Sequence, residues 1–130
     1  MIIMHKKLFF VFIVLAIVVG IYIISQPETI NFSLKNQQVK LLVARTPAQW
    51  QRGLMFYQKP IPDFDGMLFI FPEKQTRTFW NKNTYLDLEV YWLDDNNIVG
   101  QESLPSIAKS GEVVQIQSPQ AVNQVVEIIR

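Results

Sequence analysis

The sequence predicts an α+β fold: a mostly antiparallel sheet, rolled or barrel-like, with one short helix, preceded by one N-terminal transmembrane helix. Three observations carry this prediction. An apolar run without charges covers residues 8–24. Several later runs have the alternating or continuously apolar pattern of strands. A single segment, which starts at Thr46, has the residues that typically begin a helix.

The N-terminal run has the composition of a membrane-spanning helix. At ~1.5 Å per residue, a helix over residues 8–24 spans ~26 Å, close to the ~30 Å of a bilayer core. Lys6 and Lys7 precede the run, and Glu28 is the first charge after it. The positive-inside rule then predicts a cytoplasmic N-terminus and an extracytoplasmic C-terminal domain. We expect a signal-anchor over residues 1–26 and a single-pass membrane protein.

A cleaved signal peptide is the alternative interpretation of this segment. Its apolar core is normally ~7–15 residues long and is followed by a small-x-small cleavage site. The run here is longer, and residues 21–25 offer no such pair. An uncleaved anchor is therefore favoured over secretion. A buried core helix is the third interpretation, and it would need an apolar exposed face.

Composition indicates one ordinary domain after the anchor. The chain has 130 residues, which leaves room for one domain, and we expect it at residues 27–130. Twelve Lys and Arg against eleven Asp and Glu give a net charge of +1, so no nucleic-acid partner is expected.

The domain alternates between strand-like runs and turn residues. Asn36-Gln37 and the polar segment 94–97 are expected to turn two hairpins. Residues 59–63, with two prolines, and residues 106–112 are expected to be loops, and Pro72 is expected to end a strand buried on both faces. The last run could be strand or helix, and its β-branched pairs favour strand. The expected strands are 30–34, 39–44, 66–71, 86–93, 98–104, 113–117 and 121–129.

One short helix is predicted after the first two strands. Thr46 is a suitable N-cap, Pro47 suits the first helical position, and Gln49 stands three residues after the cap. Gly53 is expected near the end of the helix. Arg52 then lies where a cation interacts favourably with the helix dipole.

Two absences narrow the possible chemistry. The chain has no cysteine, which excludes disulfides, thiolate nucleophiles and cysteine-bound metals. The one histidine, His5, precedes the apolar run, so the domain has no imidazole. We therefore expect no metal site and no cofactor. Catalysis would depend on carboxylates, Lys, Tyr or hydroxyls, and the sequence leans away from an enzyme.

Four sequence blocks and two later residues occur in a recognisable order. They are Ala44-Arg45-Thr46, Arg52-Gly53-Leu54-Met55, Asp65-Gly66-Met67-Leu68-Phe69-Ile70-Phe71 and Phe79-Trp80-Asn81-Lys82-Asn83-Thr84, followed by Leu88 and Asp94. This order resembles the domain of unknown function 192 (DUF192) family, over roughly residues 39–129. These are small bacterial and archaeal proteins, often exported or membrane-anchored, and the resemblance implies a fold and a location but no reaction. The family pattern usually has Met where this chain has Asn81, and members usually continue past the position of Arg130 with a Gly-containing segment.

The polar segment after Trp80 is the candidate ligand site. An indole face can stack on a ligand, amides can donate and accept hydrogen bonds, and a lysine can bind an anion. The alternative is structural: Trp80 in the core, Asn83 in a left-handed turn, and Thr84 bonded to the backbone. The candidate ligand-binding residues are Trp80, Lys82, Asn83, Thr84 and Asp87, and no catalytic residue is assigned.

Three functions remain open at this point. The leading hypothesis is a non-catalytic, membrane-tethered extracytoplasmic domain that binds a small polar molecule or an envelope protein. The alternative is a hydrolase of envelope glycans, which needs two carboxyl groups ~5–9.5 Å apart. The third is an accessory subunit that pairs with another membrane protein through its anchor and a strand edge. The carboxyl groups considered for hydrolysis are Asp65, Glu73, Asp87 and Glu89.

Overall fold

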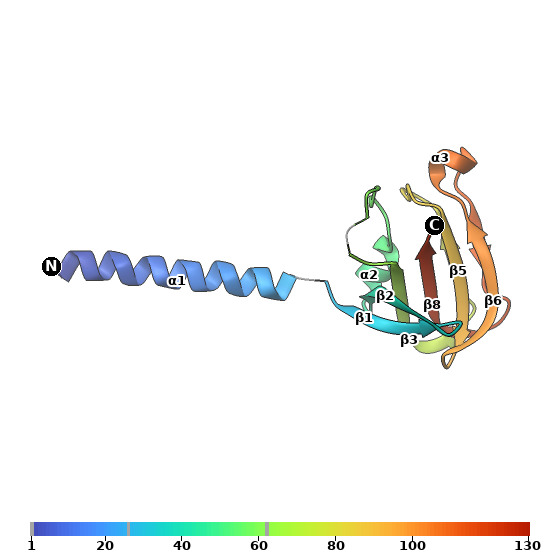
Figure 1. The fold of residues 1–130 in the computed structure, drawn as a ribbon, viewed down its shortest axis with the longest axis horizontal. Coiled ribbons are helices and arrows are strands. Elements are labelled where there is room, and N and C mark those ends of the chain that lie inside the picture. Colours follow the sequence, from blue (N-terminus) through green and yellow to red (C-terminus); the bar gives the residue numbers. More distant parts are fainter. Residues whose placement is uncertain (1, 26, 62) are drawn as a thin grey trace.

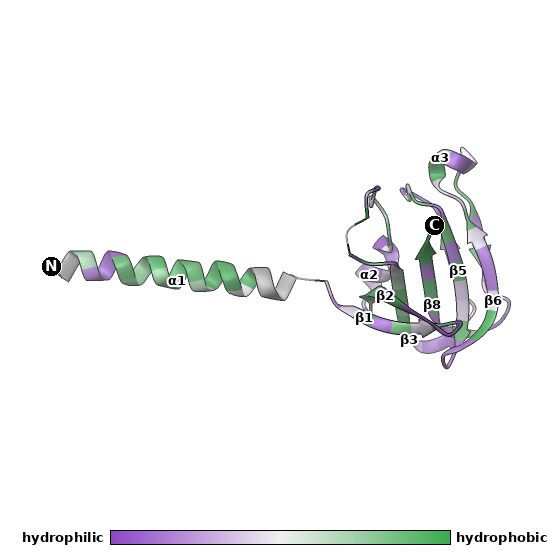
Figure 2. Cartoon of the chain, in the orientation of Figure 1, coloured by the Kyte–Doolittle hydropathy of each residue, from purple (hydrophilic) through white to green (hydrophobic). Residues whose placement is uncertain are grey.

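A computed structural model describes residues 2–25, 27–61 and 63–130, as an N-terminal helix followed by an α+β domain (Figure 1). Helix α1 (Ile2–Ser25) is apolar on all sides over most of its length (Figure 2). Its segment Met4–Ile21 is long and apolar enough to cross a membrane, and none of that segment is buried. A signal sequence has the same features, so the helix is compatible with an uncleaved anchor and with a cleaved signal peptide.

Six strands form one curved sheet in the order β1-β2-β3-β8-β5-β6, and the sheet is not closed into a barrel. Strands β2 and β3 run parallel, and every other neighbouring pair is antiparallel. The predicted α+β class with a mostly antiparallel sheet is thereby confirmed. The strands are β1 (Thr29–Leu34), β2 (Gln37–Ala44), β3 (Gly66–Gln75), β5 (Leu88–Asp94), β6 (Asn97–Leu104) and β8 (Val122–Ile129).

Four short elements complete the domain. Helix α2 (Pro47–Arg52) confirms the predicted helix, and β4 (Thr78–Trp80) pairs with β7 (Gln115–Gln117) in a separate two-stranded sheet. A second helix, α3 (Ile107–Ser110), lies where a loop was predicted. Ser106 accepts the Lys109 N–H at 3.2 Å, and this cap makes one helical turn possible in a polar segment.

Strand β3 continues past Pro72, where the sequence predicted its end. Two features of the sheet make the proline tolerable. The pairing with β2 ends at Phe69, and the register with β8 shifts between Ile70 and Gln75. Pro72 therefore stands where no ladder hydrogen bond requires a backbone N–H.

Both predicted hairpins form, one of them with its turn displaced. Asp95 and Asn96 have φ values of 46° and 68°, as a two-residue hairpin turn requires, so the prediction for residues 94–97 is confirmed. In the first hairpin the turn residues are Lys35 and Asn36, with φ values of 50° and 64°, one position earlier than predicted.

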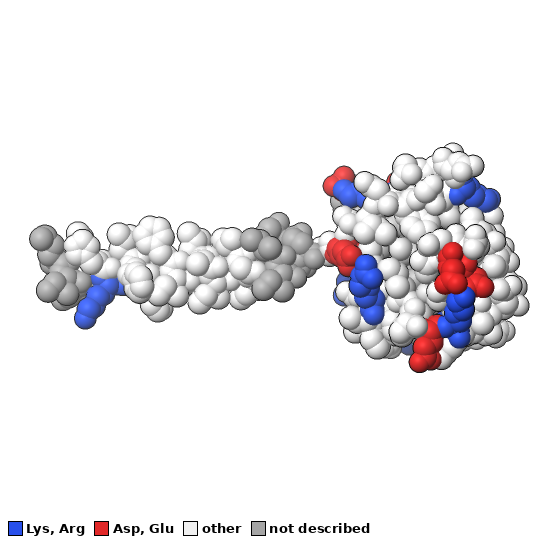
Figure 3. Space-filling view, turned by 90° about the horizontal axis from the view of Figure 1, so that it is seen from below, with Lys and Arg blue, Asp and Glu red and all other residues white. Residues whose placement is uncertain are grey.

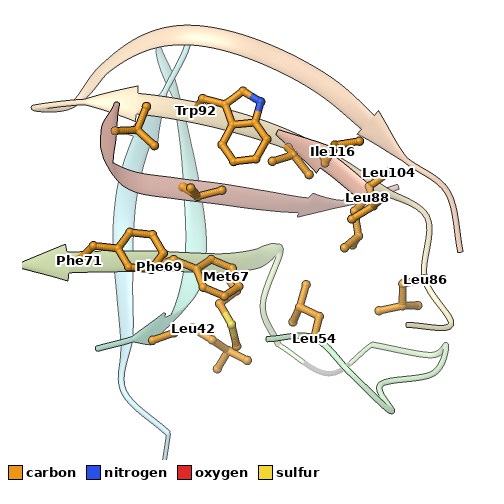
Figure 4. Packing of buried hydrophobic residues seen from close by; sticks show 14 residues of the cluster. Leu42, Leu54, Met67, Phe69, Phe71, Leu86, Leu88, Trp92, Leu104 and Ile116 are labelled. Carbon is orange, nitrogen blue, oxygen red and sulfur yellow. The ribbon is translucent and has the colours of Figure 1, made fainter. Parts of the chain in front are cut away.

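Alternation along the strands gives the sheet two apolar faces. One face carries a cluster that includes Phe69, Phe71 and Trp92 (Figure 4), and α2, β4 and β7 add residues to it. The other face carries a smaller cluster around Leu41 and Leu68, to which β1 contributes. On the surface, the face in Figure 3 shows basic and acidic side chains next to one another rather than a patch of one sign.

Candidate functional site

A cleft of about 400 Å³ opens between α2, the segment that joins β3 to β4, and the sheet. About half of its lining residues are aromatic or aliphatic, and the others include two arginines, one glutamate and several threonines. A volume in this range is typical of small-molecule sites. The cleft is lined by Trp50, Gln51, Arg52, Gly53, Leu54, Met55, Phe69, Phe71, Thr76, Arg77, Thr78, Phe79, Trp80, Thr84 and Glu127.

Helix α2 is held over the sheet by a local cap and by one tryptophan. Thr46 accepts the Gln49 N–H at 3.3 Å, and the Gln49 side chain accepts the Thr46 N–H at 3.1 Å. The Trp50 indole N–H is shared between the carbonyls of Ala44 and Ile70, each at 3.1 Å. Because these carbonyls belong to β2 and β3, Trp50 fixes the helix at the edge of the cleft.

Gly53 brings the end of α2 close to the sheet. Its φ of 48° and ψ of −132° are a conformation that residues with a Cβ rarely adopt. A Cβ built here would lie 3.3 Å from Phe69 Cζ and 3.9 Å from Glu127 Oε2. A larger residue would therefore narrow the cleft directly above Glu127.

Glu127 is a buried acid on the face of the sheet that carries the cluster with Phe69, Phe71 and Trp92. It lies on β8 between Val125 and Ile129, opposite Met67 on β3 and Val90 on β5. Only 4% of the residue is exposed, and its Oε2 has no hydrogen-bond partner within the described residues. Burial raises the pKa of this carboxyl to about 8. At neutral pH the floor of the cleft is therefore a protonated carboxylic acid.

Arg77, which also lines the cleft, has the second buried polar atom without a partner. Its guanidinium stacks on the Phe71 ring, 3.9 Å from the ring centroid, and its Nη2 donates to the Glu73 carbonyl at 2.8 Å. Its buried Nε has no acceptor in the part of the chain that the structure describes. Burial lowers the pKa of Arg77, and the guanidinium remains charged at neutral pH.

The acid and the arginines of the cleft do not pair with each other. Arg52, in the last turn of α2, and Arg77 make no ion pair with Glu127 among the residues that the structure describes. Burial alone accounts for the raised pKa of Glu127, since no neighbouring cation lowers it. The cleft thus has an acidic floor and, on other elements, two basic groups.

The predicted ligand-binding residues divide between the cleft and its surroundings. Trp80, 38% exposed, and the buried Thr84 line the cleft. Lys82 lies beside them, with Nζ 5.1 Å from the centroid of the Trp80 ring. Asn83 has a φ of 52°, and its carbonyl accepts the Phe56 N–H at 3.0 Å.

Asp87, the fifth predicted residue, holds the start of α3. Its Oδ1 accepts the Ser106 N–H at 2.8 Å, its Oδ2 lies 3.9 Å from Lys109 Nζ, and the Ser106 N–H lowers the pKa of the carboxyl. Lys82, Asn83 and Asp87 are not among the residues that line the cleft.

Asn81 organises the region around Trp80. Its fully buried amide donates to the Pro105 carbonyl and to Ser110 Oγ, each at 2.9 Å, and accepts the Val114 N–H at 2.7 Å. The turn from Trp80 to Thr84 is thereby tied to α3 and β7.

The carboxyl groups considered for hydrolysis lie elsewhere. Asp65 accepts the Lys40 N–H at 2.8 Å, Glu73 is exposed, and Glu89 accepts from Gln101 on β6. Among the residues described, Glu127 is the one carboxyl that lines the cleft, so the two-carboxylate arrangement is not assembled there. Within the same residues, no group of three or more His, Cys, Asp or Glu could hold a metal ion.

Sequence reasoning missed Glu127 and the role of Arg77. The available signal for Glu127 was its position: a lone acid in the apolar run 121–129, on the strand face shared with Val125 and Ile129. No comparable signal marked Arg77, since only the fold brings it to α2 and β8.

Comparisons with known proteins give a family and a fold. The sequence matches the model of the DUF192 family, described as uncharacterised, over residues 29–130. A search of the curated proteins found no match.

Two crystal structures are similar to the domain. A protein from Sinorhizobium meliloti 1021, provisionally named a transcription regulator, is 29% identical with a TM-score of 0.62, and the match covers 78% of this chain and 76% of that one. A protein of unknown function from Novosphingobium aromaticivorans DSM 12444 is 20% identical with a TM-score of 0.58, and the match covers 78% and 81%. The second likeness shows the fold alone.

Proposed function

We propose that this chain, which belongs to the DUF192 family, is a membrane-tethered binding domain that takes a small ligand with an anionic group into the cleft described above. The observation that carries the proposal is that Arg77 and Glu127, each with one unsatisfied buried polar atom (Nε and Oε2), line the same cleft. Buried polar atoms without partners are costly in a folded protein, and a ligand would satisfy them.

The anionic group is assigned to Arg77. Its Nε–H is free of protein acceptors within the described residues, and Phe71 fixes the plane of the guanidinium. A planar guanidinium held in this way can donate two parallel hydrogen bonds to a carboxylate or phosphate. Arg52 adds positive charge on the same cleft. The aromatic walls, with Trp80 at one side, suit the apolar part of such a ligand.

A thermal-shift and calorimetric titration of the full-length protein in detergent tests this proposal. The probes are acetate, butyrate, hexanoate and 3-phenylpropionate. A ligand that binds only the folded state raises its melting temperature, so we expect one or more of the longer carboxylates to stabilise the protein. Failure of all four to bind would contradict the proposal.

Matched variants locate the binding. Arg77→Lys keeps the charge and loses the Nε–H, and it should weaken carboxylate binding about tenfold or more, as expected for loss of a charge-assisted hydrogen bond. Arg45→Lys is the matched control, because Arg45 pairs with Glu28 outside the cleft at 3.0 Å. Equal weakening by the two variants would show that binding does not depend on the Arg77 guanidinium.

The tether is the second part of the proposal. Helix α1 has the length and the apolar surface of an anchor, and Lys6 and Lys7 at its start favour a cytoplasmic N-terminus and an extracytoplasmic cleft. Because the chain has no cysteine, Gln120→Cys in an exposed loop gives a single reporter. In intact cells a membrane-impermeant maleimide should label it, and the labelled protein should remain in the membrane at its full mass. Labelling only after lysis, or loss of the first ~25 residues, would contradict the tether.

A further inference from the structure

The two unsatisfied atoms of the cleft have opposite chemical character. Arg77 Nε is a cationic donor, and an anion can accept its hydrogen bond. The Glu127 carboxyl becomes an acceptor when it ionises, and a group with several donors can then satisfy it. Glu127 is nine-tenths or more buried and lines the cleft, and no donor reaches its Oε2 within the described chain. A ligand with an anionic group alone would leave this oxygen unpartnered.

We propose that the ligand is a zwitterion, with its ammonium group against Glu127 at the floor of the cleft and its carboxylate against Arg77. This inference rests on the proposed function, and it adds a second charged group to the ligand. An ammonium supplies three donors, which is what a carboxylate without protein donors requires. The aromatic surroundings of Glu127 favour a cation as well, because ring faces attract positive charge.

The surroundings of Glu127 are aromatic on the side of the cleft. Phe69 Cζ and Glu127 Oε2 both lie close to Gly53, at 3.3 Å and 3.9 Å from the position of a Cβ built there. Phe79 packs on Phe69 with ring centroids 4.8 Å apart. A cation at this point would lie next to the Phe69 ring and the Glu127 carboxylate. Free cations without an anionic group are disfavoured, since Arg52 and Arg77 repel them.

Binding of an ammonium requires the carboxylate form of Glu127, so it must release a proton. The charged or titratable groups that line the cleft are Arg52 from α2, Arg77 from the segment after β3, and Glu127 from β8. The facing residues of the neighbouring strands, Met67 and Val90, do not titrate. Arginine side chains are not deprotonated in proteins, so the released proton comes from Glu127. Burial raises the pKa of Glu127 to about 8, which places this release at physiological pH.

The test compares three matched series on the full-length protein in detergent by isothermal titration calorimetry. The zwitterions are 4-aminobutyrate, 6-aminohexanoate and L-phenylalanine. Butyrate, hexanoate and 3-phenylpropionate lack the amine, and butylamine, hexylamine and phenethylamine lack the carboxylate. We expect one zwitterion to bind at least about tenfold more tightly than both of its analogues, as for a hydrogen-bonded charge pair. Different chain lengths measure the separation of the two binding groups.

Two further readouts are specific to Glu127. Between about pH 6 and pH 8 the affinity for the zwitterion should rise by up to about tenfold per pH unit, with up to one proton released per ligand. Glu127→Gln should remove both the pH dependence and the preference over the carboxylate analogue, while carboxylate binding through Arg77 persists. Glu89→Gln, on the other face of the sheet, is the control and should retain the preference.

The outcomes separate the two proposals. Carboxylates that bind as tightly as the zwitterions, or zwitterion affinity that falls as the pH rises, would overturn the zwitterion while leaving the anion site of Arg77 in place. Absence of binding by every probe in all three series would overturn both.

Discussion

Two buried glutamates on neighbouring strands have opposite surroundings. Glu89 on β5 lies opposite Ile128, and Glu127 on β8 lies opposite Val90, so the two side chains point to different faces of the sheet. Glu89 accepts hydrogen bonds from Gln101 at 2.9 Å and Ser103 at 3.0 Å and pairs with Arg130. Glu127 has apolar neighbours, and its Oε2 has no partner within the described residues.

The difference separates an acid that the fold has satisfied from one that it has not. On the face of Glu89, the hairpin of β5 and β6 supplies polar partners in register. On the face of Glu127, the neighbours supply an open cleft instead. An unpartnered buried acid lowers stability and is retained where it serves a ligand or a reaction. The comparison therefore supports a structural role for Glu89 and the ligand-binding role that we propose for Glu127.

The largest expected effect is a pH dependence of stability that comes from Glu127. In the unfolded chain this carboxyl ionises near its ordinary pKa of 4.5, whereas in the folded protein the pKa is about 8. The folded protein favours the protonated carboxyl, so the contribution of Glu127 to the free energy of unfolding is complete below the unfolded-state pKa. This contribution is lost as the pH rises toward the folded-state pKa. Relative to Glu127→Gln, the wild type should lose about 1.4 kcal/mol per pH unit, or roughly 3 kcal/mol between pH 5 and 7.5.

Denaturant unfolding of both proteins across this pH range measures the loss. The difference in the free energy of unfolding between wild type and Glu127→Gln could instead stay constant with pH. The carboxyl would then be ionised in the folded state, and Glu127 would not differ from Glu89 in its protonation.

The second prediction tests the satisfied acid. Glu89→Ala removes the acceptor of Gln101, Ser103 and Arg130 from a half-exposed network. We expect the free energy of unfolding to fall by about 2 kcal/mol. This is at the low end for loss of a buried, charged acceptor, because the side chain of Arg130 is 53% exposed. Urea unfolding at pH 7 measures it, and ligand binding in the cleft should not change. A stability equal to wild type would place Glu89 among the acids without a structural role.

How far sequence reasoning reached depends on whether a feature is local. The cap of α2 and the turn at Asp95 and Asn96 follow from residues within a few positions of one another, and the structure confirms them. The continuation of β3 through Pro72 was predicted wrongly, because its tolerance depends on where the pairing with β2 and β8 ends. The one-turn helix α3 was missed in part for a similar reason, since Asp87 and Asn81, distant in sequence, hold it in addition to its local cap at Ser106.

The candidate site was predicted in part. Trp80 and Thr84 were identified from a cluster of polar and aromatic residues, and both line the cleft. Glu127 and Arg77 lie far from this cluster in the sequence, and only the order of the sheet and the position of α2 bring them together. The local pattern could mark Glu127 as an isolated acid in an apolar run, but it could not place Glu127 or Arg77 in the cleft.

A smaller effect is expected from Gly53→Ala, which narrows the cleft above Glu127. The new Cβ would meet Phe69 Cζ at 3.3 Å in a backbone conformation that L-residues rarely adopt. We expect a destabilisation of about 1 kcal/mol and weaker ligand binding. Gly111→Ala is the matched control: its φ is also positive, at 73°, but a Cβ there meets nothing within 4 Å. If the two variants bound ligand equally well, the space above Glu127 would not be part of the site.

The smallest expected effect concerns Lys82, one of the residues predicted from the sequence to bind a ligand. Its Nζ lies 5.1 Å from the centroid of the Trp80 ring, and Trp80 in turn lines the cleft. A cation over an exposed indole contributes about 0.5–1 kcal/mol, so Lys82→Ala should change the free energy of unfolding by no more than about 0.5 kcal/mol after partial replacement by water. Because Lys82 would act on a ligand through the Trp80 ring, its removal should weaken binding by less than about threefold, against about tenfold or more for Arg77→Lys.

Lys109→Ala, at another exposed lysine beyond the cleft, controls for the loss of one positive charge. Calorimetric titration of the three variants measures the order. A loss of binding in Lys82→Ala as large as in Arg77→Lys would move the anion site from Arg77 to the turn after Trp80. The contrast between the two glutamates would then no longer mark where the ligand binds.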